Sequence, residues 1–333
     1  MLVQIQKDLE RLDGGSSAYI YAVNDQVVLK SPVTFVPPAD DSSQIAQYEY
    51  ALHTVCHHED IANERILLKR LERTPHTNIL QAVSLDHPEG IYLRRHIPLS
   101  RRLQTKKAAQ SIRIAWYRDM LRALVHLHKL EIAHADVRLD NFLCHSEDAI
   151  VLCDFTCSRP FGQDNPSATC PSESLRVNGH SQIVSDITDR FALASVMFEI
   201  ETGTKPDLTL VNNNLELPAV KTGNKILDLV IEKAWLANYE STMDMLRDIE
   251  SLSGPSGPEI GSDLQMTAIE SLQNQVNDWR RMRIRKHGKI STRQRLVSRL
   301  LTLRRRSSIP WSVCRRTSQS SQAAPDIGIS SRL

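Results

Sequence analysis

Two acidic residues and one asparagine stand in a segment whose pattern predicts that they meet in space. Asp136 and Asn141 lie in the polar stretch 134–141, and Asp154 follows after two short apolar runs that flank the polar turn 145–148. Such runs around a short turn are typical of a β-hairpin. Because a hairpin returns its second strand beside its first, we expect Asp154 to lie near Asp136 and Asn141. A cluster of this kind can hold a divalent cation and orient a hydroxyl group, which is what phosphoryl transfer requires of a protein.

The same segment resembles the catalytic loop and the metal-binding triplet of eukaryotic-type protein kinases, H-R-D-L-x-x-x-N and D-F-G. His134, Asp136 and Asn141 match the loop, and Asp154 with Phe155 matches the triplet. The resemblance extends over about residues 8–252, and the last helices of that range are similar to those of small divergent kinase-like proteins of fungi.

Two residues depart from the family pattern next to these matches. Ala135 replaces the arginine that can bind a phosphate on the activation segment, so we predict an activity that does not depend on phosphorylation in residues 159–185. Thr156 replaces the glycine and adds a Cβ where the chain is expected to turn, which is predicted to disturb Asp154. The A-P-E motif is also missing, and 171–173 is a doubtful remnant of it.

A lysine and a glutamate far apart in the sequence are predicted to pair. Lys30 ends the apolar run 27–30, which resembles the V-A-I-K strand whose lysine binds nucleotide phosphates. Glu64 precedes three leucines by three, four and seven residues, which places its carboxylate on the apolar face of a helix that runs to about Arg73. A buried carboxylate needs a partner, and Lys30 is the candidate.

The resemblance also implies a nucleotide site and its ligands. Small residues in a loop between two strands let backbone N–H groups approach phosphate oxygens, although only Gly15 and Ile20 of the family's glycine-loop pattern are retained. The implied nucleotide-binding residues are Gly14, Gly15, Ser16, Ser17, Ala18, Ile20, Lys30, Leu93 and Asp154.

The family's roles carry over to matching positions of this chain. Asp136 would accept the proton of the substrate hydroxyl, and Asn141 and Asp154 would hold Mg²⁺. Lys30, paired with Glu64, would hold the phosphates of ATP. Arg138 stands at the position of the catalytic-loop lysine; it keeps the positive charge, but its guanidinium is larger and planar.

These features predict an α+β, bilobal, protein-kinase-like fold. We expect a kinase-like domain over residues 1–252, with a small antiparallel-sheet N-lobe (1–95) and a larger helical C-lobe (96–252). A long amphipathic helix is predicted over 108–130. A buried helix is predicted from about residue 185, with Asp189 near its start.

The remaining residues, 253–333, are predicted to be a linker and a largely disordered basic tail, in which 265–279 has a helical pattern. Between residues 280 and 316 there are fourteen Lys or Arg and no acidic residue, while the whole chain carries a net charge of only +2. The tail therefore suits an acidic partner, nucleic acid or an anionic membrane, or else it is a solvated extension.

Composition limits the location of the chain. No run of eighteen apolar residues is present, so a transmembrane helix is not expected. The six cysteines fall at irregular spacings without a CxxC pair, which favours an intracellular protein, cytoplasmic or nuclear.

Three functions fit this sequence. The leading one is an ATP-dependent protein kinase that phosphorylates Ser or Thr on a protein substrate. A pseudokinase that binds nucleotide or acts as a scaffold is favoured by the altered glycine loop, Thr156 and the missing A-P-E. A small-molecule phosphotransferase shares the H-x-D-x-x-x-x-N pattern and a later aspartate.

Overall fold

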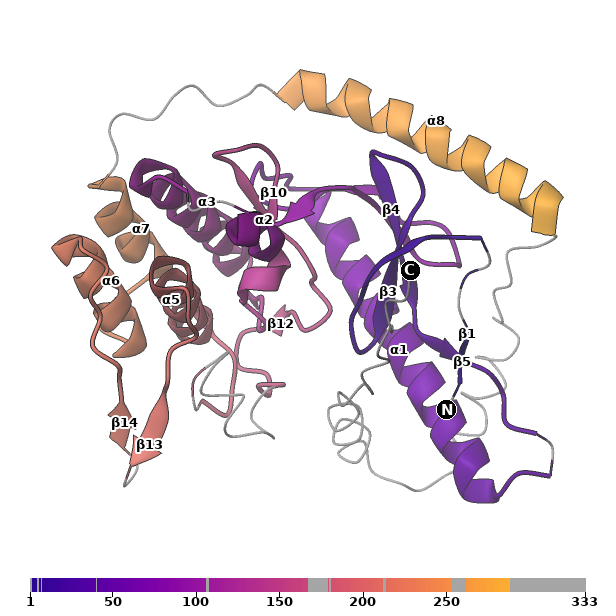
Figure 1. The fold of residues 1–333 in the computed structure, drawn as a ribbon, viewed down its shortest axis with the longest axis horizontal. Helices are drawn as coiled ribbons and strands as arrows, with labels where there is room; N and C mark the ends of the chain where they lie inside the picture. The colour runs from indigo at the N-terminus through magenta and orange to yellow at the C-terminus, as the bar shows by residue number, and fades with distance from the viewer. Residues whose placement is uncertain are drawn as a thin grey trace, which may run out of the picture.

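The chain divides into a sheet-rich half and a helical half, as the sequence predicts (Figure 1). The computed structural model describes residues 2–4, 6, 8–39, 41–105, 108–166, 179, 181–211, 214–252 and 262–287. The described residues confirm the α+β, bilobal fold class.

The N-lobe is built on a five-stranded antiparallel sheet in the order β2-β3-β4-β7-β6. Alternate residues of its strands point to opposite faces. Val28 and Leu93 therefore belong to the main core, whereas Leu29 and Tyr92 belong to a second cluster behind the sheet. The strands are β2 (Arg11–Gly14), β3 (Ala18–Ala22), β4 (Val27–Pro32), β6 (Ala82–Ser84) and β7 (Ile91–Arg94), and β1 (Val3–Gln4) pairs separately with β5 (Thr34–Phe35).

Helix α1 (Gln44–Leu71) covers the main-core side of this sheet. It begins after Ser43, whose hydroxyl accepts the N–H of Ala46 at 3.2 Å and so caps the helix. Its buried apolar residues include Ile61 and Leu68, and Glu64 lies between them on the same face.

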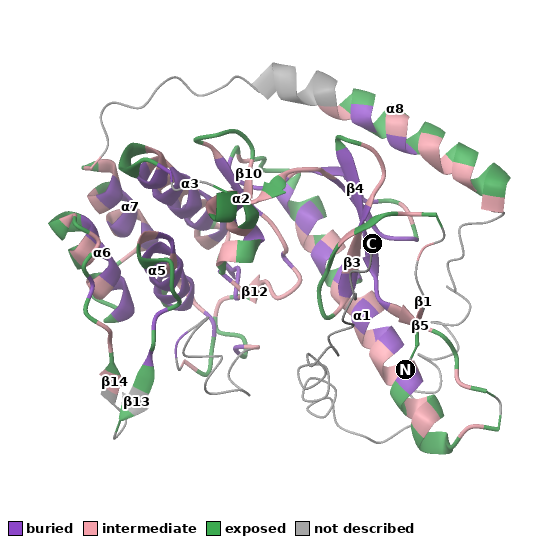
Figure 2. Cartoon of the chain, viewed as in Figure 1, coloured by how far each residue is buried: buried purple, intermediate pink, exposed green. Residues whose placement is uncertain are grey.

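The C-lobe is a helical bundle around α5 (Asp186–Thr202), which is buried along most of its length (Figure 2). Ser185 caps the start of α5, and Gly203, with a φ of 78°, ends it in the left-handed conformation that glycine favours. The other helices are α2 (Leu99–Thr105), α3 (Gln110–Lys129), α6 (Lys225–Trp235) and α7 (Thr242–Glu250). The strands of the C-lobe are β8 (Ile97–Pro98), β9 (Ile132–Ala133), β10 (Phe142–Cys144), β11 (Ile150–Leu152), β12 (Arg159–Pro160), β13 (Thr209–Val211) and β14 (Asn214–Glu216).

The hairpin predicted around the polar turn is present. β10 and β11 pair with Phe142 opposite Leu152 and Cys144 opposite Ile150. A 3₁₀ turn at Leu139–Asn141 precedes β10, and Asp154 follows β11 by two residues. The hairpin thus returns Asp154 to the loop that contains Asp136.

A further helix, α8 (Ser262–His287), lies along the N-lobe although it follows the C-lobe in sequence (Figure 1). Its Leu272 and Val276 pack against Leu29 and Tyr92, on the sheet face opposite α1. The remainder of the predicted tail, 288–333, lies outside the described residues. Within the part of the chain that the structure describes, no helix has the length and apolar character needed to cross a membrane.

Candidate active site

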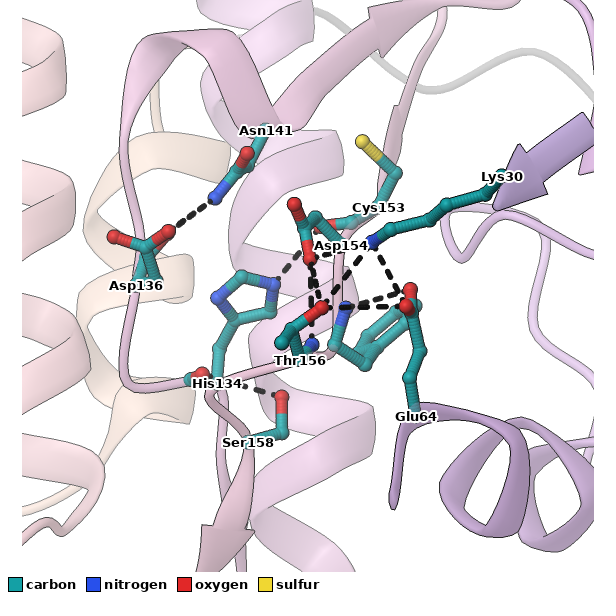
Figure 3. Close-up of polar contacts among 10 residues, drawn as sticks. Lys30, Glu64, His134, Asp136, Asn141, Cys153, Asp154, Thr156 and Ser158 are labelled. Carbon is teal, nitrogen blue, oxygen red and sulfur yellow. Dashed lines mark hydrogen bonds and ion pairs between the residues drawn. The ribbon is translucent and has the colours of Figure 1, made fainter. Parts of the chain in front are cut away.

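Lys30 and Glu64 form a buried ion pair between β4 and α1. The Nζ of Lys30 lies 2.8 Å from Oε2 of Glu64, and the two side chains are 5% and 1% exposed. The same Nζ lies 2.8 Å from Oδ1 of Asp154 (Figure 3). Burial alone would lower the pKa of Lys30, but the two carboxylates outweigh it and raise that pKa above its ordinary value.

Asp154 is fixed by Lys30 and by Thr156. Its backbone has a φ of 61°, in the left-handed region that side chains seldom adopt. The Thr156 hydroxyl lies 2.7 Å from Oδ1 of Asp154 and 3.2 Å from Oε2 of Glu64. Although burial would raise it, Lys30 and the hydrogen bonds from Thr156 hold the pKa of Asp154 below its usual range. Asp154 is therefore a carboxylate at neutral pH.

The loop 134–141 is anchored by Asp189 of α5. Its carboxylate accepts the backbone N–H groups of His134 and Ala135 at 2.7 and 3.0 Å. Ala135 itself has a φ of 61° and is buried against Val184, so an apolar contact replaces the phosphate-binding arginine of the family. The imidazole of His134 contacts the carbonyl oxygen of Cys153 at 3.0 Å, which joins the loop to the strand leading to Asp154.

Asp136 and Asn141 form the second half of the site. The Asn141 side-chain amide donates to the carbonyl oxygen of Asp136 at 2.8 Å and to its carboxylate at 2.9 Å. Burial raises the pKa of Asp136 to about 6, even though His134, Arg138 and the Asn141 bond favour the charged form. A carboxylate with this pKa is ionised at pH 7 and still basic enough to take a proton.

The donor set fits a hard divalent cation. The Asn141 amide nitrogen is used by Asp136, which leaves its amide oxygen outside that contact, and Lys30 and Thr156 use only Oδ1 of Asp154. Figure 3 shows the amide oxygen of Asn141 and the second carboxylate oxygen of Asp154 directed away from these bonds. One carboxylate and one amide oxygen are ligands that Mg²⁺ accepts together with phosphate oxygens and water.

The glycine loop forms a tight turn between β2 and β3. Gly15 donates its N–H to the carbonyl oxygen of Ala18 at 2.9 Å, and Gly14, Gly15 and Ser16 are exposed. The Ser17 carbonyl oxygen instead accepts the N–H of Val33 at 2.8 Å. The loop therefore presents a short exposed tip.

Other predicted nucleotide-site residues take apolar positions. Ala18 and Leu93 are buried in the main core, and Ile20 packs against it. Leu93 pairs with Val28 across β4 and β7, two residues from Lys30.

Arg138 is placed at the edge of the site. Its guanidinium donates to Oδ2 of Asp140 at 2.6 Å, and both side chains are about half exposed. The structure therefore shows Arg138 bonded to Asp140, while its charge still acts on Asp136.

Sequence reasoning missed the role of two hydroxyl groups. Ser158 donates to the carbonyl oxygen of His134 at 3.1 Å, and Thr156 joins Glu64 to Asp154. The sequence did contain a signal for Thr156. At a position where the family has glycine, this residue adds a hydroxyl close to the predicted charges of Asp154 and Glu64. Because Thr156 is not among the described residues with positive φ, its Cβ does not stand where the backbone demands glycine.

Fold and site together define a protein kinase, and comparison with known proteins agrees. Residues 40–255 match the protein kinase domain family. The chain therefore belongs to the protein kinase family.

The matches to curated relatives cover only part of each chain. Ribosomal protein S6 kinase alpha-4 of Homo sapiens is 34% identical over 98 residues, covering 26% of this chain and 12% of that protein. A probable serine/threonine-protein kinase of Dictyostelium discoideum is 22% identical over 198 residues, covering 51% of this chain and 45% of that protein. The chain thus spans less than half the length of these relatives.

Proposed function

We propose that the chain is an active, ATP-dependent protein kinase that transfers a phosphoryl group to a Ser or Thr hydroxyl. The observation that carries this proposal is the joined set Lys30, Glu64 and Asp154, with 2.8 Å between the lysine nitrogen and each carboxylate. In protein kinases both the Lys–Glu pair and the metal-binding Asp must be in place for activity. The contacts of Lys30 with Glu64 and Asp154 support the assignment of these two roles. The name of one relative, a probable serine/threonine-protein kinase, supports the choice of acceptor.

Each polar residue has a task in this reaction. Asp136 accepts the hydroxyl proton, and Asn141 orients Asp136 through its amide N–H group. Asn141 and Asp154 would hold Mg²⁺, which supplies charge neutralisation of the phosphates when bound. Lys30 positions the phosphates, and Glu64 holds Lys30.

Arg138 offers a positive charge close to Asp136, where the transferred phosphate would lie. To contact the transferred phosphate, the Arg138 guanidinium has to break its ion pair with Asp140 or bind both groups at once.

A pseudokinase is the second candidate, and the glycine loop favours it. Only Gly15 and Ile20 of the family's loop pattern are retained, and the Gly15 N–H already donates to the carbonyl oxygen of Ala18 at 2.9 Å. This N–H group is therefore not offered to nucleotide phosphates. The third function, a small-molecule phosphotransferase, is not proposed, because the family match is to protein kinases.

The test uses the purified full chain. Mg²⁺-dependent ATP binding is measured first, followed by phosphate transfer to the chain itself and to a generic protein, beside Asp136→Asn. We expect binding in both proteins and transfer only with Asp136 intact. Absence of nucleotide binding would contradict the enzyme and leave a scaffold, and binding without Asp136-dependent transfer would establish the pseudokinase.

Regulation follows from the same proposal. Because Ala135 gives no cation for an activation-segment phosphate, the phosphatase-treated enzyme should retain its activity. The expected location, cytoplasmic or nuclear, stays a prediction. The acidic, nucleic-acid or membrane partner of the basic tail stays a prediction.

A further inference from the structure

The turn between β6 and β7, residues 85–90, is held from both sides of the N-lobe. On the α1 side, Arg65 donates from one nitrogen, Nη2, to the carbonyl oxygens of His87 and Gly90 at 2.8 and 3.1 Å. On the α8 side, the Arg280 guanidinium binds the carboxylate of Glu89, with Nε to Oε1 at 2.5 Å and Nη2 to Oε2 at 3.2 Å.

Glu89 is a buried charge that depends on α8. Its side chain is 1% exposed, and the Tyr92 hydroxyl donates to Oε1 at 2.7 Å. Although burial would raise it, the bonds from Arg280 and Tyr92 lower the pKa of Glu89. Loss of Arg280 would leave this carboxylate in the interior with neutral donors alone, the Tyr92 hydroxyl and the backbone of Glu89, which is costly.

The same turn touches the strand that bears Lys30. Ser31 donates its hydroxyl to the carbonyl oxygen of Glu89 at 2.8 Å. Gly90 lies so close that a Cβ there would come within 2.1 Å of the carbonyl oxygen of Lys30. The turn therefore contacts the residues next to Lys30 in β4 and next to Glu64 in α1.

Helix α8 packs on the N-lobe through residues 272–279. Leu272 and Val276 are 6% and 0% exposed among Leu29 and Tyr92 of the sheet. Trp279 meets the Tyr92 ring edge-on at 6.1 Å, and Asn24 donates to Gln275 at 3.0 Å. This helix begins beyond residue 255, where the family match ends.

We propose that α8 is a positioning element of the active site, in which Arg280 acts through Glu89 and the 85–90 turn to hold Lys30 and Glu64 in register. This rests on the proposed function in so far as the Lys30–Glu64 pair serves nucleotide binding. Arg280 is a positioning residue, because it contacts neither the nucleotide site nor the predicted catalytic residues.

The experiment compares Arg280→Gln with Arg281→Gln in the full chain. Arg281 is the matched control, since it is the next residue of the same helix and is 69% exposed. Among the described residues its polar contacts are with its own helix, at Asp278 and Asn277. Hydrogen exchange of the amides of residues 60–70 is measured without nucleotide, and affinity for a fluorescent ATP analogue with Mg²⁺ is measured well below the unfolding temperature.

We expect faster exchange around Glu64 and about tenfold weaker nucleotide binding in Arg280→Gln, within the range usual for coupled sites. Neither quantity should change in Arg281→Gln. Adding Glu89→Gln to Arg280→Gln should partly restore both the slow exchange around Glu64 and the nucleotide affinity, because no buried carboxylate is then left unpaired. Should Arg280→Gln not fold, Arg280→Lys is compared with Arg281→Lys in the same assays.

Exchange that rises only in α8 and the 85–90 turn, with residues 60–70 unchanged, would overturn the proposal and leave α8 as a stabilising helix. If the unaltered protein does not bind nucleotide, the proposed function fails while the exchange comparison still decides the coupling.

Discussion

The hydroxyl of Thr156 lies 2.7 Å from Oδ1 of Asp154 and accepts a contact from Lys30 at 3.2 Å. It also lies 3.2 Å from Oε2 of Glu64, so its single proton goes to the nearer carboxylate, Asp154. The residue that replaces the family's glycine therefore joins the three charged groups of the site. Thr156 strengthens an arrangement that it was expected to disturb.

Removing only this hydroxyl should loosen the site. Thr156→Val keeps the shape of the side chain and is expected to lower the free energy of unfolding by about 1–3 kcal/mol, because buried charged groups lose a hydrogen-bond partner. Urea unfolding checks the stability, and Mg²⁺-dependent nucleotide binding checks the site. Thr156→Ser, which retains the hydroxyl, is the control, and equal behaviour of the valine and serine variants would contradict this role.

Asp136 should impose a pH limit on phosphate transfer. Its pKa is raised to about 6 by burial, so the carboxylate becomes protonated as the pH falls below that value. Protonated Asp136 cannot accept the hydroxyl proton, and kcat/KM should fall about tenfold for each pH unit below about 6. A profile of kcat/KM from pH 5 to 8 checks this, and a flat profile through pH 6 would remove Asp136 as the base.

The sequence allowed the charged residues of the site to be predicted because each lies in a strong local pattern. Glu64 stands on an apolar helix face, and the hairpin returns Asp154 to Asp136 whatever surrounds it. Arg280 gave no such signal, since it is one of many basic residues in the tail and its partner Glu89 is 191 positions away. Long-range pairing of this kind leaves no periodicity in the sequence. The sequence indicated a helical pattern over 265–279, but it did not indicate that this helix would pack on the sheet through Leu272 and Val276.

Lys30 should be needed both for the stability of the fold and for nucleotide binding. Lys30→Met leaves Glu64 as an uncompensated buried charge, which costs about 3–5 kcal/mol of stability. It also removes the cation for the phosphates, so nucleotide binding should be lost. Lys30→Met with Glu64→Gln should regain stability in urea unfolding without regaining nucleotide binding. Recovery of binding in the double variant would show that Lys30 has only a structural role.

Asp119, in α3, should make stability depend on pH. It is 7% exposed, and burial raises its pKa to about 6, although its carboxylate accepts the N–H of Ile150 at 3.2 Å. Because the folded pKa lies above the ordinary aspartate value of 3.8, the contribution of Asp119 to stability is greatest below about pH 4 and is lost as the pH rises through 6.

Asp119→Asn removes this ionisation. The variant should be about 2 kcal/mol more stable than the parent at pH 7.5 and nearly equal to it at pH 4. Urea unfolding at both pH values measures the difference, with the exposed Asp207→Asn as control. A stability gain that is equal at both pH values would show that the ionisation of Asp119 is not its cause.

Gly90 should be the least replaceable glycine of the N-lobe. Its φ of 154° lies in a region that only glycine adopts readily, which costs about 1–3 kcal/mol for another residue. A Cβ there would also meet the carbonyl oxygen of Lys30 at 2.1 Å, and this atom belongs to a central strand that cannot move freely. Gly90→Ala should therefore both destabilise the protein and displace Lys30.

A substitution at Gly162 distinguishes the conformational cost of a positive φ from the clash of a new Cβ with its neighbours. Gly162 has a φ of 80° but nothing within 4 Å of the position of a Cβ, so Gly162→Ala should carry the conformational cost alone. Thermal unfolding and nucleotide affinity are compared for both variants. We expect the nucleotide affinity to fall only in Gly90→Ala, because only there does the new methyl group press on the strand that bears Lys30. Equal losses of stability with unchanged affinity would show that the 85–90 turn does not transmit strain to the Lys30–Glu64 pair.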